Sequence, residues 1–255
     1  KATGHDATAG MFSVRKGIWG QHGDSWRNPG YDQGPTHPVV GVSWKDAQTF
    51  CKWLTRRDRA EGKISGNQSY RLPTDEEWNQ AVGNTKYPWG NQWPPAGVAN
   101  CAGSEANDAD WCNDWETIEG YQDAYPRTSP VGSFPADPYG LFDMGGNVWQ
   151  WCEDWYDGSQ TSRVMRGGAW DFSNPNCSLR HYRYSRTPNY CGDRIGFRCV
   201  LASEEAGSTD SQPHSLQFRW VATRGNTYLP AELLSDGSDP TGQRKLRVLR
   251  EVVMD

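Results

Sequence analysis

The stretch that most constrains this chain is residues 139–156, YGLFDMGGNVWQWCEDWY, in which three tryptophans fall within seven positions. A Gly-Gly-Asn turn comes first, and Val148 and Gln150 then alternate with Trp149 and Trp151. A period of two is typical of a β-strand, and aromatic side chains at this density bury a large area. We therefore expect a short strand after the turn, in a central position of the fold.

The composition indicates one loop-rich domain with an aromatic core and an appendage. The 255 residues include 14 tryptophans, 28 glycines and 16 prolines, which is not the composition of a helical bundle. A mean hydropathy of −0.86 and the lack of a long apolar run predict no transmembrane segment. The net charge of −5 argues against binding to nucleic acid.

Two helices are predicted from capping boxes. Ser43 is followed three residues later by Asp46, and Thr74 is followed by Glu77 at the same spacing. Apolar residues with helical periodicity come after each box: Ala47, Phe50, Cys51 and Leu54, and then Trp78, Ala81 and Val82. Residues 1–36 and 83–138 are rich in Gly, Pro, Asn and Asp, so we expect them to be irregular.

The end of the chain is predicted to be a separate β-rich extension. Residues 203–215, SEEAGSTDSQPHS, have the composition of a linker. Residues 216–255 contain two strand-like stretches, LQFRWVA and KLRVLREVV, with a connection at Ser235–Gly242 between them. About 40 residues are too few for a core of their own. We therefore expect 216–255 to pack on the main domain or to bind a partner protein through a hairpin edge.

Several motifs in a fixed order carry a resemblance to a known family. They are HPVVGVSWKDAQTFCKWL from His37, RLPTDEEW from Arg71, GGNVWQWCEDWY from Gly145, RVMRGGAW from Arg163 and IGFRCV from Ile195. Together they resemble the formylglycine-generating enzyme, or sulfatase-modifying factor, family. The resemblance implies an irregular α+β fold over residues 1–202, a variant of the C-type lectin fold with little regular secondary structure.

The family includes oxidases, sulfoxide synthases and non-catalytic binding domains, so the fold alone does not fix the function. The sulfoxide synthases use an iron site built with histidines. The five histidines of this chain form no HxxxH pair, which argues against that activity.

The oxidases of the family bind Cu(I) through two cysteine thiolates, in a frame that starts with Gly-Gly-Ser. Here Gly167–Gly168 begin the frame, Ala169 replaces the serine and Phe172 replaces the first cysteine. Cys177 alone matches, and a phenyl ring cannot bind copper. We therefore expect a non-catalytic member. The alternative is a formylglycine-generating oxidase with unusual copper ligation, in which Cys177 would be catalytic and Cys191 could supply a second thiolate.

The resemblance also implies calcium in the long irregular region, where many oxygen ligands occur. The matching ligands are the Asn100 side chain, the Cys101 carbonyl, the Asp123 carboxylate and the Tyr125 carbonyl. The alternative is a loop of solvated acidic residues. A second family calcium lies at the turn that contains Asn147, but Gln150 replaces the usual glutamate there, which weakens the prediction of that site.

Seven cysteines occur in the chain, without a CxxC or zinc-like spacing. In the secreted family enzyme the positions that match Cys51 and Cys199 form a disulfide. The resemblance thus implies a contact between these sulfurs, bonded if the protein is extracytoplasmic, which is the location we favour. Buried free thiols are the alternative.

Segment 170–194 combines aromatic and adaptable polar side chains, a chemistry typical of binding surfaces. Some relatives diversify this segment to bind ligands. The candidate ligand-binding residues are Trp170, Phe172, Asn174, His181, Tyr182, Asn189 and Tyr190. We expect Tyr184 to lie in the core, and Arg166 and Arg198 to brace buried carboxylates. The predicted function is a recognition or scaffold module; the alternative for this segment is an ordinary loop with buried tyrosines.

Overall fold

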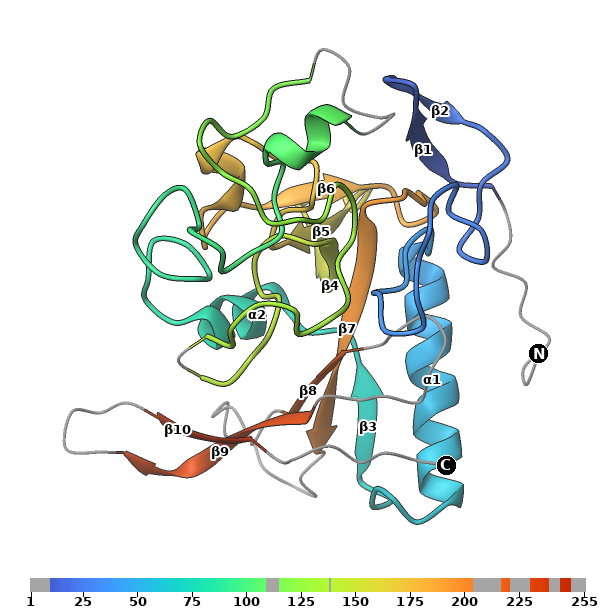
Figure 1. Cartoon of the computed structure of the whole chain (residues 1–255). Helices are drawn as coiled ribbons and strands as arrows, with labels where there is room; N and C mark the ends of the chain where they lie inside the picture. Colours follow the sequence, from blue (N-terminus) through green and yellow to red (C-terminus); the bar gives the residue numbers. More distant parts are fainter. Residues whose placement is uncertain are drawn as a thin grey trace.

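The computed structural model describes residues 10–108, 115–137 and 139–203, and the backbone of three further strands. The fold is α+β: a mixed sheet runs through the middle, helix α1 (Trp44–Ala60) lies along one side, and loops cover the other (Figure 1). In the described part of the chain, no helix is long and apolar enough to cross a membrane.

Strand β7 (Ile195–Ser203) organises the sheet, whose strand order is β10-β9-β8-β7-β4-β5-β6. Strand β4 (Trp149–Trp155) pairs with β7 in parallel, with Trp149 opposite Ile195. Strands β3 and β8 pair antiparallel with the later half of β7. The remaining bounds are β3 Gln68–Arg71, β5 Arg163–Arg166, β6 Tyr184–Arg186, β8 Gln217–Trp220, β9 Pro230–Ser238 and β10 Arg244–Val248.

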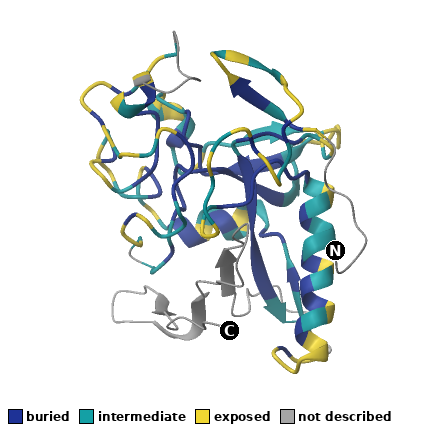
Figure 2. Cartoon of the chain, turned by 45° about the vertical axis from the view of Figure 1, so that its right-hand side comes forward, coloured by how far each residue is buried: buried dark blue, intermediate teal, exposed yellow. Residues whose placement is uncertain are grey.

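The predicted central strand is confirmed. Strand β4 lies between β7 and β5, and Trp149, Gln150 and Trp151 are all fully buried, so the strand is covered on both faces. Strand β7 is likewise buried along most of its length (Figure 2). A glutamine inside this core needs hydrogen-bond partners for its amide.

Both predicted helices begin at their capping boxes. At α1, Asp46 N donates to Ser43 Oγ (3.1 Å) while Ser43 N donates to Asp46 Oδ2 (2.9 Å). Helix α2 (Asp75–Val82) has the same reciprocal bonds between Thr74 and Glu77. Two short 3-10 helices, η1 (Ser104–Asp108) and η2 (Pro175–Ser178), lie in the loop regions.

The N-terminal region was predicted to be irregular, and this is wrong for residues 12–21. Strands β1 (Phe12–Arg15) and β2 (Ile18–Gln21) form a two-stranded hairpin. The two residues between them, Lys16 and Gly17, both have positive φ, 48° and 73°. This is the type I′ geometry that matches the twist of paired strands.

The described residues after 216 form three strands, where two were predicted. Strands β8 and β10 correspond to the expected stretches, but β9 occupies the first part of the expected Ser235–Gly242 connection. Strand β8 pairs with β7, with Phe218 opposite Val200. The side chains of this extension and residues 204–215 lie outside the described residues, so their roles as partner surface and linker stay predictions.

The sulfurs of Cys51 and Cys199 lie 3.3 Å apart, so the predicted contact between α1 and β7 is present. Both thiols are free in this structure. Their hydrogen bond and their burial raise the pKa of the Cys51 thiol well above its usual value.

Candidate functional site

Strand β5 ends at Arg166, and the bend at Gly167–Gly168 then turns the chain past the start of β4. The Gly167 carbonyl accepts a hydrogen bond from Gly146 N (2.8 Å), which ties this bend to the turn before β4. After the bend, Ala169 and Trp170 are buried, and the chain reaches the surface from Phe172 onward.

An aromatic cluster surrounds buried Trp149. The ring centroids of Phe172 and Tyr184 lie 5.2 and 5.1 Å from that of Trp149, and Tyr182 lies at 6.1 Å. Phe172 meets Trp149 edge to face, at an interplanar angle of 85°. These outer rings are half-buried, so each packs on the core and is also partly exposed to solvent.

Arg166 fixes the backbone that carries Tyr182. Its Nη1 donates to the carbonyls of Arg180 (2.8 Å) and Tyr182 (2.9 Å), and its Nε pairs with Asp75 at the start of α2. Arg166 thus pairs with a carboxylate as predicted, although that of Asp75 is half-buried rather than buried. The aromatic cluster therefore stands on a fixed backbone, which reduces the entropy lost on binding.

Arg186 joins this cluster to a second aromatic pair. Its guanidinium lies 4.6 Å from the Tyr184 ring and 5.0 Å from the Tyr190 ring, within cation–π range. Tyr190 in turn stacks on Phe12, at 5.2 Å and 8°. The sequence reasoning did not include Arg186 or Phe12 in the site. The arginine between two tyrosines was a usable signal, but the contact with Phe12 depends on the unpredicted hairpin.

The predicted ligand-binding residues divide by exposure. Asn174, His181 and Asn189 are exposed, while Phe172, Tyr182 and Tyr190 are half-buried. We define these six residues together with Tyr184 and Arg186 as the aromatic surface.

Two predictions for segment 170–194 need correction. Trp170 is a core residue, 1% exposed, with Arg127 over its ring, so it cannot serve as a surface anchor. Tyr184, predicted to be core, is half-buried at the surface. The burial of Trp170 follows the bend, since residues 169–171 are all buried before the chain emerges at Phe172. Tyr184 instead lies on β6, the last strand in the sheet order.

At the copper position of the family oxidases, the Phe172 ring occupies the place of the first cysteine and packs on Trp149. Cys177, in η2, is half-buried and hydrogen-bonded to the Tyr182 hydroxyl, whose pKa is raised to about 12, chiefly by burial. Cys191 is buried, which raises the pKa of its thiol to about 11. A thiol with such a raised pKa is a poor source of thiolate at neutral pH.

The first calcium position has groups that fit the ion. Asn100 Oδ1 is buried without a hydrogen-bond partner, while its Nδ2 donates to the Arg127 carbonyl (2.8 Å). Asp123 accepts bonds from the backbone amides of Cys101 (2.8 Å) and Tyr125 (2.9 Å), which holds its carboxylate in the same loop cluster. Burial is the main cause that raises the pKa of Asp123 to about 7. An unpartnered buried oxygen needs a donor or a cation, and calcium accepts this mixture of amide, carbonyl and carboxylate ligands.

The described residues contain no group of three or more His, Cys, Asp and Glu side chains that could hold a metal. A calcium site with a single carboxylate does not require such a group.

The second calcium position does not fit. The Asn147 amide makes two hydrogen bonds with the backbone of Ser129, at 3.1 and 3.2 Å. Gln150 is also fully engaged: its Oε1 accepts from Trp78 Nε1 (2.8 Å) and Arg198 Nε (2.7 Å), and its Nε2 donates to the Asp143 carbonyl (3.0 Å). Gln150 thus has an amide, engaged in hydrogen bonds, where the family's glutamate would supply a carboxylate to the ion.

Arg198 was predicted to brace a carboxylate, but its described hydrogen bonds differ. Its Nη2 donates to the backbone carbonyls of Phe142 (3.0 Å) and Asp143 (3.2 Å), and its Nε donates to Gln150. The buried guanidinium therefore stabilises the turn before β4 by hydrogen bonds to the main-chain carbonyls of that turn.

Comparison with known proteins agrees with this architecture. Residues 1–203 match the family described as "Sulfatase-modifying factor enzyme 1-like domain". An "Inactive C-alpha-formylglycine-generating enzyme 2" from Bos taurus is 35% identical over 190 residues, which are 69% of this chain and 55% of that protein. A "Formylglycine-generating enzyme" from Thermomonospora curvata is 30% identical over 190 residues, 65% of this chain and 56% of that protein. Among solved structures, PvdO from Pseudomonas aeruginosa matches with a TM-score of 0.55 and 25% identity, over 78% of this chain and 72% of PvdO.

The chain belongs to the sulfatase-modifying factor, or formylglycine-generating enzyme, family. It spans about half the length of the curated relatives it matches. Relatives named as enzymes and as inactive proteins are similar to it at comparable identity, so the family assignment leaves the activity to be argued from the site.

Proposed function

We propose that this domain is a non-catalytic recognition or scaffold module that binds a ligand or partner protein through the aromatic surface. The observation that carries the proposal is Phe172. It replaces a copper-binding cysteine and uses its ring to build an aromatic contact surface on Trp149. The site thus loses the soft ligand that oxidase chemistry needs and gains an apolar contact.

The composition of the aromatic surface supports recognition. Half-buried aromatic rings with few rotatable bonds supply contact area at low entropic cost, and exposed amide and imidazole groups beside them supply adaptable hydrogen bonds. A relative named as inactive is consistent with a non-catalytic role for a member of this family. A protein is the partner we expect, because half-buried tyrosines, a phenylalanine and an arginine are the residues that dominate protein interfaces.

The test compares affinity with stability for single variants. A partner captured by the wild-type protein should bind Phe172→Ala and Tyr182→Ala more weakly by about 1–3 kcal/mol, as at interface hot spots. His181→Ala, at an exposed position, should weaken binding without changing the melting temperature. Calorimetry for affinity and thermal unfolding for stability give both values.

The matched control is Phe50→Ala. Phe50 is also half-buried and packs on Phe197, but it lies on α1. The Phe50→Ala substitution should lower the melting temperature and leave the affinity for the partner unchanged. If Phe172→Ala and Tyr182→Ala behave like Phe50→Ala, with a lower melting temperature and an unchanged affinity, the aromatic surface is structural and the proposal fails.

We also propose that calcium occupies the site formed by Asn100, Cys101, Asp123 and Tyr125. Calcium that binds only the folded state should raise the melting temperature. At a calcium concentration one hundred times Kd, the free energy of unfolding should increase by about 3 kcal/mol. Asp123→Asn should abolish this response to calcium and to a chelator. The exposed Asp157→Asn variant should respond like wild type. Equal melting temperatures with calcium and with chelator would show that the site does not bind the ion.

A further inference from the structure

Arginines gather around the aromatic surface, although the chain as a whole carries a net charge of −5. The described ion pairs balance these arginines only in part, since the Asp75 carboxylate pairs with both Arg166 and Arg183. The arginines between residues 163 and 194 that form no described ion pair are Arg163, Arg180 and Arg186. The aromatic surface therefore carries more positive charge than its own ion pairs balance.

Arg186 lies on strand β6, the last strand in the sheet order (Figure 1). The strand register places it directly opposite Arg163 on β5. Directly opposite side chains lie on the same face of a sheet, where like charges repel. The Arg163 guanidinium contacts the rings of Trp44 and Trp155, at 3.8 and 3.4 Å, and is attracted by Glu153 of β4. No described carboxylate pairs with Arg186, so its charge is the less balanced of the two.

The guanidinium of Arg186 is held in place while part of it stays open to solvent. The rings of Tyr184 and Tyr190 lie 4.6 and 5.0 Å from it, and such cation–π contacts leave its N–H groups unused. Nη1 donates to the Ser185 carbonyl over 3.4 Å, and the Tyr190 hydroxyl accepts a further hydrogen bond. No guanidinium nitrogen of Arg186 is both buried and without a partner. The remaining N–H groups therefore reach solvent.

We propose that Arg186 binds a carboxylate of the partner protein, so that the aromatic surface recognises a segment with an acidic residue beside an apolar one. This inference rests on the function proposed above and adds the chemistry of the partner. Arginine pairs with a carboxylate through its planar fork of N–H donors. The carboxylate would also offset the repulsion between Arg186 and Arg163. The net negative charge of the chain favours a protein over a nucleic acid as the source of the anion.

The first test selects binders to the full chain from random peptides displayed on phage. Peptides that bind through the aromatic surface are identified by their loss of binding to Phe172→Ala. We expect Asp and Glu to be enriched among these peptides, and we expect selection on Arg186→Gln to lose that enrichment. Arg56→Gln, at an exposed arginine on α1, should select acidic peptides as wild type does.

Calorimetry on one selected peptide then measures the carboxylate contact itself. Replacing the acidic residue of the peptide with its amide should weaken binding to wild type about tenfold, the effect of one charge-assisted hydrogen bond. The same replacement should have little effect on binding to Arg186→Gln, because the carboxylate has already lost its partner there. Arg186→Lys keeps the charge without the fork and should retain part of the preference for the acidic peptide.

The selection separates failure of this inference from failure of the proposed function. If no selected peptide depends on Phe172, the function proposed for the aromatic surface fails, and this inference fails with it. If the peptides depend on Phe172 but are not enriched in Asp and Glu, the carboxylate contact is overturned and the proposed function stands. The same holds if Arg186→Gln weakens acidic and neutral peptides equally. Displacement of the acidic peptides by oligothymidylate at equal concentration would overturn the choice of a protein partner.

Discussion

Replacing Arg198 with methionine should lower the free energy of unfolding by about 3–5 kcal/mol, the usual cost of removing one partner from a buried charged group. Arg198 is 1% exposed and donates to Gln150 and to the carbonyls of Phe142 and Asp143. Methionine fills much of the volume but leaves these acceptors without their donor. It also leaves the buried Asp143 carboxylate without its neighbouring cation. Urea denaturation would measure the change.

Two further variants make the Arg198 result specific. Lysine at this position keeps the charge but lacks the planar fork of donors that reaches three acceptors. The free energy of unfolding of Arg198→Lys should therefore lie between those of wild type and Arg198→Met. Arg56 lies exposed on α1, and Arg56→Met should change stability by no more than about 0.5 kcal/mol. Equal unfolding midpoints for the Arg198 and Arg56 variants would show that the guanidinium does not hold the turn.

Replacing Gly146 with alanine should lower the free energy of unfolding by about 3 kcal/mol or more, because left-handed backbone strain and steric overlap add together. Gly146 has φ +75°, and a Cβ atom there would lie 2.3 Å from the Asn100 carbonyl oxygen. Neither side can yield easily, because Asn147 N donates to that same oxygen (2.9 Å) and Gly146 N donates to Gly167 (2.8 Å). Thermal or urea unfolding gives the value.

Gly158→Ala is the matched control for Gly146→Ala. Gly158 is exposed, and a Cβ atom added there would meet no other atom within 4 Å. Alanine at this position should therefore be nearly neutral, within about 0.5 kcal/mol. A Gly146→Ala protein as stable as the Gly158→Ala protein would contradict the close approach of the two loops.

The parts of the fold that could be predicted are those with local signals. The capping boxes at Ser43 and Thr74 define helix starts by hydrogen bonds over three residues, and the density of tryptophans around Trp149 indicated a buried strand. The hairpin at Phe12–Gln21 also has local signals, an alternation around Lys16-Gly17, but the Gly and Asp content of its surroundings hid them.

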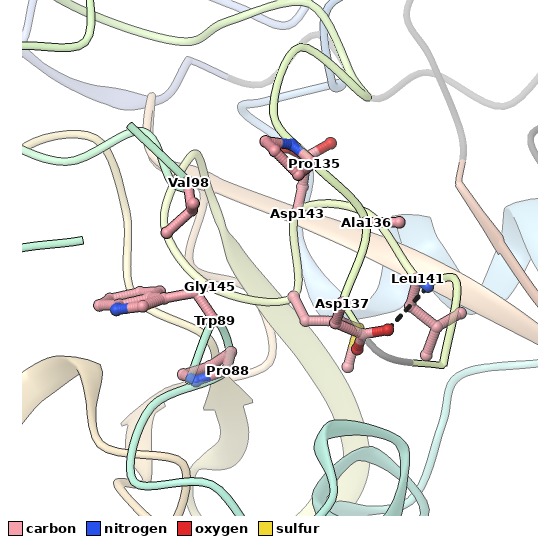
Figure 3. Close-up of a pocket in the computed structure, with 10 residues that line it drawn as sticks. Pro88, Trp89, Val98, Pro135, Ala136, Asp137, Leu141, Asp143 and Gly145 are labelled. Carbon is pink, nitrogen blue, oxygen red and sulfur yellow. Dashed lines mark hydrogen bonds between the residues drawn. The ribbon is translucent and has the colours of Figure 1, made fainter. Parts of the chain in front are cut away.

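The parts that could not be predicted depend on long-range contacts. Trp89, Asp137 and Asp143 line one pocket between loop segments 88–98 and 135–145 (Figure 3). These loops have no sequence periodicity, so no spacing rule predicts that the three residues lie near one another. Gln150 could be recognised as a replacement for glutamate, but its bonds to Trp78, Arg198 and the Asp143 carbonyl appear only once α2, β4 and β7 are packed. The inward turn of Trp170 likewise depends on the direction of the Gly167–Gly168 bend rather than on residue type.

The most direct test of the proposed function is a copper and peptide-oxidation assay on the wild-type protein. The protein is incubated with Cu(I), oxygen and a peptide that carries the sulfatase cysteine, and mass spectrometry follows conversion to formylglycine. The Thermomonospora curvata enzyme serves as the positive control. We predict no conversion, because Cys177 is the only thiol at the two copper-binding positions and Phe172 cannot bind copper. Conversion by the wild-type protein that is lost in the Cys177→Ser variant would contradict the account and establish an oxidase.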